Sequence, residues 1–151
     1  MTYDPQSDNA EMLHLYKQEV KYRPELPDRA TLLLRARLVL EEALEFVKAC
    51  GCTTVISHLE YEDRIEAYDL GAKPDLVEYA DACGDILVVT YGALNAAGIK
   101  VEPLWDEILR SNRSKVWPDG TIHKREDGKV IKPTTWSPPD IEMVLYKQEG
   151  S

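Results

Sequence analysis

Residues 32–50 read LLLRARLVLEEALEFVKAC, an apolar stretch that glutamates interrupt at helical spacing. Leucine, alanine and valine predominate, which favours one long helix that is apolar on most of its sides. Asp28 is a suitable N-cap and Gly51 a suitable stop, so the pattern predicts a helix over residues 29–49. At about 100° per residue, the glutamates share one side of that helix and form an acidic patch. They are Glu41, Glu42 and Glu45.

A second apolar stretch, residues 75–94 (DLVEYADACGDILVVTYGAL), also carries acids at helical spacing. We predict a helix over residues 74–97 that stops at Gly98. Its acids follow an i, i+3, i+7 spacing, within an arc of about 60°. They are Glu78, Asp81 and Asp85. Asp85 directly precedes the most hydrophobic run of the chain, and a helix that is apolar all round is expected to be buried.

Two such helices facing each other bring together as many as six carboxylates. A lone buried carboxylate is costly, and like charges at close range repel strongly in a low dielectric. No Lys or Arg lies inside either cluster, so a divalent cation is the simplest compensating charge. Oxygen-only ligands select Mg²⁺, for which Mn²⁺ substitutes, and Mg²⁺ commonly completes its shell with substrate phosphates. The pattern therefore indicates phosphoryl or nucleotidyl chemistry. The alternative is that these acids are solvated faces of amphipathic helices.

The charge of the chain changes sign along its length. The whole chain has a formal net charge of −9, which argues against binding to nucleic acid or to an anionic membrane. Residues 110–132, by contrast, hold seven basic and three acidic side chains. A basic arm on an acidic bundle can bring cations to the phosphate oxygens of a substrate. The candidate phosphate ligands are Asn112, Arg113, Lys115, Lys124 and Lys132.

The chain of 151 residues suits a single domain, residues 1–151. Its expected parts are an N-terminal segment (1–27), a helical core (28–114) and an irregular basic arm (115–151). The strongest periods are helical, so the fold class expected is all-α.

Weaker patterns place the other elements. We expect a short helix over residues 10–20, a connector with a short helix over residues 52–73, and a further helix over residues 102–114. Residues 121–132 predict a small hairpin with Asp-Gly at its turn. Residues 117–151 otherwise show no helical period.

Several classes of protein are disfavoured by composition. The first residues are polar and acidic, unlike a secretory signal. The longest nearly apolar run, residues 86–99, is shorter than the ~20 residues that a membrane span needs. Three cysteines are an odd number, which fits a reducing cytoplasm better than a disulfide framework.

Other metal centres have little support. A di-iron or di-manganese bundle needs two Glu-x-x-His pairs, and the chain has one, Glu11 and His14, away from the acidic helices. Cys50-x-Cys52 lacks the second pair that a zinc finger requires.

The acidic helices and the arm resemble a known family. The segment EEALE, residues 41–45, matches the EExxE signature of the MazG-like, all-α nucleoside triphosphate pyrophosphatases. Residues 78–99 (EYADACGDILVVTYGALNAAGI) resemble the second metal-binding helix of that superfamily. Residues 111–140 are similar to the C-terminal arm of its phosphoribosyl-ATP pyrophosphohydrolase-like branch, many of whose members are viral. The resemblance spans residues 32–140.

The resemblance implies a four-helix core built from two chains, as a homodimer or homotetramer. It implies Mg-dependent cleavage between the α and β phosphates of a nucleoside triphosphate, with two or three ions held by the six acids. Water would attack the α-phosphorus in line, and Glu41 or Glu42 would accept its proton. The ExxD motif of the family fits Glu78 and Asp81, yet the family Asp usually precedes an apolar run, as Asp85 does. The ligand assignment therefore stays open.

The substrate is implied only by resemblance. Some viral members of this branch act on purine deoxynucleotides, so dGTP or dATP is favoured, in the host cytoplasm if the chain is viral. Alternatives are phosphoribosyl-ATP, dUTP, or no catalysis at all, in a helical dimerisation or regulatory module. The base site is unassigned. Possible stacking partners are Tyr16, Trp105, Trp117 and Trp136, and possible readers of the base edge are Asn9, Glu11 and His14.

Overall fold

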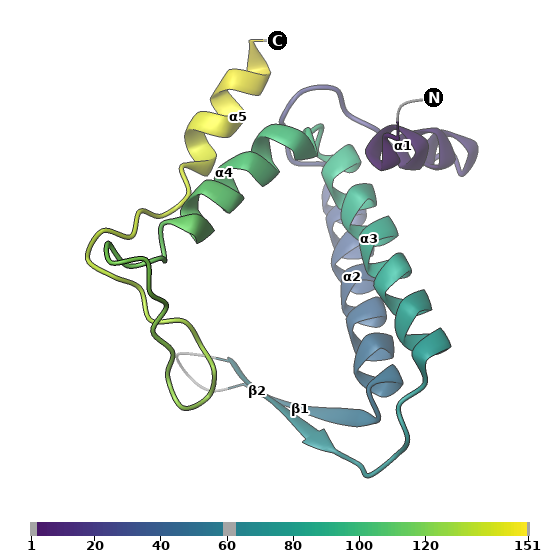
Figure 1. Ribbon diagram of the computed structural model, residues 1–151. Helices are drawn as coiled ribbons and strands as arrows, with labels where there is room; N and C mark the ends of the chain where they lie inside the picture. Colours follow the sequence, from purple (N-terminus) through teal and green to yellow (C-terminus); the bar gives the residue numbers. More distant parts are fainter. Residues whose placement is uncertain (1–2, 59–62, 151) are drawn as a thin grey trace.

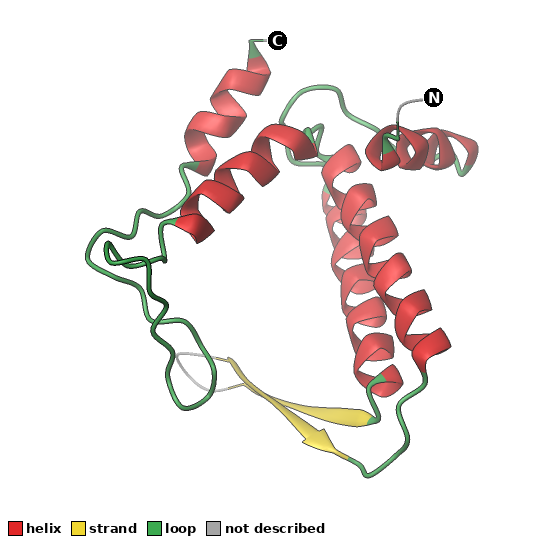
Figure 2. Cartoon of the chain, viewed as in Figure 1, coloured by secondary structure: helices red, strands yellow, loops and turns green. Residues whose placement is uncertain are grey.

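The computed structural model describes residues 3–58 and 63–150. The described chain is mostly helical, as predicted, with one small antiparallel sheet (Figures 1 and 2). In order, its elements are α1 (Pro5–Leu15), α2 (Arg29–Ala49), β1 (Cys52–His58), β2 (Asp63–Asp69), α3 (Leu76–Ala96), α4 (Val101–Arg113) and α5 (Ile141–Glu149).

Helices α2 and α3 run side by side in opposite directions and form the centre of the fold (Figure 1). Two contacts set their register. A Cβ added to Gly92 would lie 2.9 Å from Nη1 of Arg35, and the rings of Phe46 and Tyr79 are 4.9 Å apart between centroids. Between these contacts the register brings the middle of α2 level with the first half of α3. This is where both acidic patches lie.

The predicted helix over residues 29–49 is confirmed at both ends. Asp28 caps α2, and its Oδ1 accepts a hydrogen bond from the backbone N–H of Thr31 at 2.7 Å. Gly51 has a φ of 75°, and a Cβ there would collide with the backbone of Ala72, so the stop requires glycine.

The helix predicted over residues 74–97 is confirmed, although α3 begins two residues later. Asp75 is its N-cap, with Oδ1 accepting from the backbone N–H of Val77 at 2.8 Å, which leaves Pro74 outside. Gly98, with a φ of 65°, ends the helix as expected. The prediction for α4 is one residue late at each end.

The expectation of a helical connector over residues 52–73 is wrong. Residues Cys52–His58 and Asp63–Asp69 pair as an antiparallel hairpin, with Cys52 opposite Asp69 and Ile56 opposite Ile65. The β-branched run from Thr53 to Ile56 favours the extended backbone and outweighs the charged residues that follow. Residues 59–62 of the predicted charged helix lie outside the described part.

The predictions for the two termini are also wrong. Helix α1 begins at Pro5 rather than at residue 10, because Asp4 caps it and proline suits a first turn. Helix α5 occupies residues expected to have no helical period. Asp140, which follows two prolines, caps it by accepting from the N–H of Met143 at 3.0 Å. The arm does contain the predicted Asp-Gly turn, closed by a bridge between Lys124 and Val130.

The chain buries few large apolar side chains. Leu13 and Val144 are the bulkiest side chains in its small buried apolar set, whose other members are alanines. Leu33 of α2 is 58% exposed, Leu87 of α3 56% and Trp105 of α4 60%. The expectation that the second acidic helix is buried on all sides is wrong for one chain, because α1 and α2 cover only part of α3.

Among the described residues, no single helix has the length and apolar character to cross a bilayer; α3 and α4 reach them only as a pair bent by 113°. Cys50, Cys52 and Cys83 form no disulfide in the structure.

Candidate active site

The acidic patches of α2 and α3 face each other around Glu42. Its Oε2 is buried and has no hydrogen-bond partner among the described residues. Burial, and then the negative charges of Asp85 and Glu45, raise the pKa of the Glu42 carboxyl above its ordinary value. Asp85 is half-buried rather than fully buried. The two helices therefore place carboxylates of both patches within electrostatic reach of one another.

Glu41 points to a different partner. Its Oε1 forms an ion pair with Nε of Arg37, at 3.5 Å, one helical turn earlier. The statement that no basic residue lies inside the cluster holds for the sequence segment but misses this neighbour. Both side chains are more than half exposed, so the pair is screened by solvent.

The remaining candidate acids lie toward the far end of the helix pair. Glu45 and Glu78 line a shallow hollow of about 420 Å³ together with Lys48 and Lys73. Asp81 is exposed. Because lysines share this hollow, the acids nearest to it are partly compensated within the chain.

The residues present fit a hard divalent cation in kind, but they are not gathered into a complete ligand set. Within residues 3–58 and 63–150, no three acidic, His or Cys side chains lie close enough to hold a metal ion. The fit rests on Glu42, whose buried oxygen has no partner and faces carboxylates on α3. Oxygen ligands of this type suit Mg²⁺ or Mn²⁺.

The predicted phosphate ligands lie away from these acids. Figure 1 shows α4 and the arm on the other side of the chain from the halves of α2 and α3 that carry the carboxylates. Lys115 donates a hydrogen bond from Nζ to Oδ1 of Asn112, at 2.6 Å, so this predicted pair does lie together. Lys132 stands 3.6 Å above the ring of Trp136. Arg113 and Lys124 are exposed.

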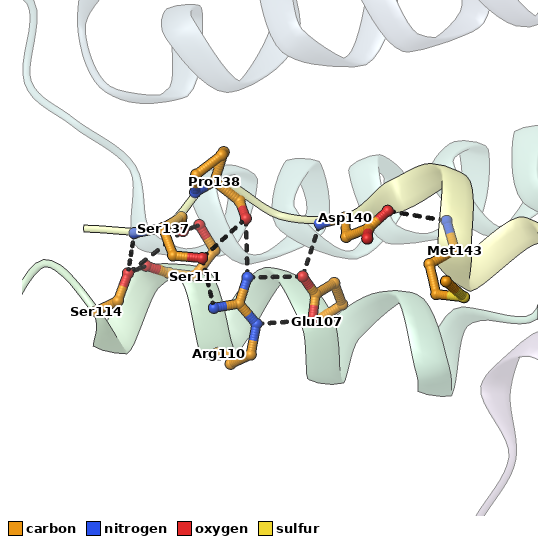
Figure 3. A network of polar contacts seen from close by, with 8 residues as sticks. All are labelled: Glu107, Arg110, Ser111, Ser114, Ser137, Pro138, Asp140 and Met143. Atoms are coloured by element: carbon orange, nitrogen blue, oxygen red, sulfur yellow. Dashed lines mark hydrogen bonds and ion pairs between the residues drawn. The ribbon is translucent and has the colours of Figure 1, made fainter. Parts of the chain in front are cut away.

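A polar network fastens the arm to α4 (Figure 3). Glu107 accepts two hydrogen bonds from Arg110, at 2.7 and 2.8 Å, and one from the backbone N–H of Asp140, at 2.7 Å. Arg110 also donates to the carbonyl of Pro138 at 2.8 Å. The bonds from Arg110 are the main cause that lowers the pKa of Glu107 to about 2. Arg110 therefore holds the start of α5 and is not free for a substrate.

A cavity of about 590 Å³ lies between α1, α2 and α3. Arg35 reaches it from α2, Tyr91 and Gly92 from α3, and Asp8 and Asn9 from α1. Of the four aromatic side chains considered as stacking partners, Tyr16 alone lines this cavity. Trp117 packs on His123, with 4.4 Å between ring centroids, and His14 interacts with the hydroxyl of Tyr22.

Arg35 is a candidate that the sequence interpretation missed. It lies inside the stretch LLLRARLVLEE, seven residues before Glu42, and only 7% of its surface is exposed. A signal was present: a spacing of seven residues puts both side chains on one face of the helix, the face that turns toward α3.

Comparison with known families places these features. The model of the phosphoribosyl-ATP pyrophosphohydrolase family matches residues 10–112. The chain belongs to this family. The match includes all six candidate acids and Asn112 and ends before the rest of the arm. A search of curated proteins finds no match.

Members of the phosphoribosyl-ATP pyrophosphohydrolase family are hydrolases that act on acid anhydrides, and they typically depend on divalent metal ions. The expected class of enzyme and the resemblance to the MazG-like branch are thus confirmed. The alternative of a non-catalytic helical module is not supported.

Proposed function

We propose that the chain is a Mg-dependent pyrophosphohydrolase that cleaves a nucleoside triphosphate between the α and β phosphates, giving a monophosphate and pyrophosphate. One observation carries this proposal: the buried, unpartnered Oε2 of Glu42, level with Asp85 on the facing helix. A buried carboxylate oxygen beside other carboxylates is stabilised by a cation and by little else.

The roles of the acids follow from their positions. Glu42 and Asp85 are the ligands at the centre of the helix pair, and Glu45 and Asp81 extend the set toward Glu78. A divalent cation bound there neutralises phosphate charge and makes water a stronger nucleophile. Glu41 or Glu42 accepts the proton of the attacking water. Glu41, kept ionised by Arg37, and Glu42, with its raised pKa, suit this role for different reasons.

The arm supplies cations for the phosphate chain of the substrate. Asn112 and Lys115 act as a pair, with Arg113, Lys124 and Lys132 around them. Because the arm lies apart from the acids of its own chain, we place it over the acids of a second copy. The network at Glu107 and Arg110 fixes the end of the arm that is closest to α5.

The exposed surface supports a homo-oligomer. The chain exposes 11540 Å². A folded monomer of 17.2 kDa exposes about 7,800 Å². The excess, about 3,700 Å² per chain, is large enough for an obligate interface. We propose that α2 and α3 pair with the same helices of a second copy in a four-helix core, covering apolar side chains such as Leu33 and Leu87.

The favoured substrate is a purine deoxynucleoside triphosphate, and phosphoribosyl-ATP and dUTP are the alternatives. The test is a panel of all nucleoside and deoxynucleoside triphosphates, with phosphoribosyl-ATP added, in Mg²⁺ or Mn²⁺. Cleavage at the expected bond releases a monophosphate and pyrophosphate. Release of a diphosphate and inorganic phosphate, or no cleavage of any substrate, would overturn the proposal.

A further inference from the structure

Arg35 has no counter-charge in the cavity between α1, α2 and α3. Its Nη2 donates to Oε1 of Gln18 at 2.9 Å, and its Nε is buried without a partner. No carboxylate of the described residues forms an ion pair with it. A guanidinium has five N–H donors and no acceptor, and burying it with so few partners is costly. A ligand that brings acceptor atoms would satisfy it.

The other polar groups of the cavity narrow the choice of ligand. The amide of Asn9 is used on both sides, since Oδ1 accepts from Asn95 at 3.0 Å and Nδ2 donates to the carbonyl of Val88 at 3.1 Å. Asp8 also lines the cavity, and its carboxylate makes no hydrogen bond among the described residues. The cavity thus offers a donor fork and an acceptor between apolar walls that include Leu38 and Leu87.

The cavity is also at the right place for a nucleoside. Arg35 precedes Glu42 by seven residues on α2, and Gly92, which contacts Arg35, follows Asp85 by seven residues on α3. Seven residues are two helical turns, about 10.5 Å along the axis. A ligand whose base lies at Arg35 would therefore extend its phosphates toward the carboxylates along the same helix pair.

We propose that this cavity binds the nucleobase of the substrate and selects guanine, with Arg35 donating to O6 and N7 and Asp8 accepting from N1–H and the 2-amino group. Guanine presents two adjacent acceptors, for which arginine is the usual partner. Adenine presents its 6-amino donor in place of O6, so it would oppose the guanidinium. This inference rests on the proposed function, because it names the base that the same site accepts.

The test compares steady-state α–β cleavage of dGTP, dITP, 7-deaza-dGTP and dATP. We expect dGTP to have the lowest KM, 7-deaza-dGTP to lose the contact to N7, and dITP to lose the contact of its missing 2-amino group to Asp8. Arg35→Met is expected to raise the KM for dGTP about 10- to 100-fold, with a much smaller change for dATP. Equal KM values for dGTP and dATP in the wild-type protein would overturn the inference.

A second variant keeps every functional group in place. Gly92→Ala would put a Cβ 2.9 Å from Nη1 of Arg35, at the flexible end of that side chain, and so displace the guanidinium. It should raise the KM for dGTP while kcat and thermal stability stay near wild type. Arg29→Met, an exposed arginine at the start of the same helix, is the matched control and should change neither value.

Binding of dGMP in EDTA, measured by calorimetry, separates this inference from the proposed function. If the wild type cleaves no nucleotide but binds dGMP more tightly than dAMP, and Arg35→Met removes the difference, the base site stands and the proposed reaction fails. If the wild type cleaves nucleotides but Arg35→Met keeps the wild-type preference for guanine, the reaction stands and the base site fails. If it neither cleaves nor binds, both fail.

Discussion

Arg35 and Glu42 lie two turns apart on one face of α2, and each buries a polar atom that no described residue satisfies, Nε in Arg35 and Oε2 in Glu42. The two atoms belong to groups of opposite charge, yet they are too far apart along the helix to satisfy each other. A ligand that brings hydrogen-bond acceptors to one and a cation to the other would satisfy both. A nucleotide bound with a divalent metal ion is such a ligand.

The first prediction concerns the acids. Glu42→Gln or Asp85→Asn should lower kcat at least about 10²-fold, because each removes charge where the substrate phosphates are stabilised. The melting temperature should stay the same or rise, because a repelling carboxylate is removed. Pyrophosphate release and thermal melts measure these effects. Glu149→Gln, at the exposed end of α5, is the control. Wild-type turnover in either variant would refute the site.

The second prediction concerns the metal. Dialysis against EDTA should abolish pyrophosphate release, and Mg²⁺ or Mn²⁺ should restore it, because hard cations prefer carboxylate oxygens. Asp85→Asn should need a higher concentration of Mg²⁺ for half-maximal activity than the control Glu149→Gln. Unchanged activity after complete removal of divalent ions would contradict the assignment.

The third prediction concerns assembly. Leu33→Glu places a charge on an exposed apolar position of α2 and should lower the oligomer mass measured by light scattering. Activity should fall with it, since we place the arm over the acids of another copy. Leu70→Glu, which is as exposed but lies just after β2, should leave the mass unchanged. A wild-type protein that is monomeric at high concentration would refute the shared site.

The fourth prediction concerns the arm. Lys115→Ala and Asn112→Ala should each raise the KM for the triphosphate about 10-fold, because both lose a charged or polar contact to phosphate. Binding of the free nucleoside should stay unchanged. Lys100→Met, an exposed lysine just before α4, is the control. The assignment would be wrong if both KM values matched that of the control.

The fifth prediction concerns pH. The pKa of Glu107 is about 2 in the folded chain, below its ordinary value of 4.5. The ionised carboxylate therefore contributes stability above pH 4.5, and this contribution is lost as the pH falls from 4.5 toward 2. In urea unfolding, the wild type should lose stability over this window more steeply than Glu107→Gln. Parallel pH profiles for the two proteins would show that Glu107 makes no such contribution.

Local patterns in the sequence predicted the long helices well. Asp28, Gly51 and Gly98 mark helix ends through capping and left-handed backbone, which depend on near neighbours alone. The same kind of signal was present at Asp140 but was overlooked among prolines. The hairpin was missed because a strand gains stability from its partner, here the segment from Asp63 to Asp69.

The sequence alone determined that two helices carry acids at helical spacing among apolar residues, because spacing along a helix is local. Only the tertiary structure decided that Glu42 buries an unpartnered oxygen, that Glu41 turns to Arg37, and that Arg35 lines a cavity with Asp8. These outcomes depend on how α1, α2 and α3 pack, and packing joins residues that lie far apart in the chain.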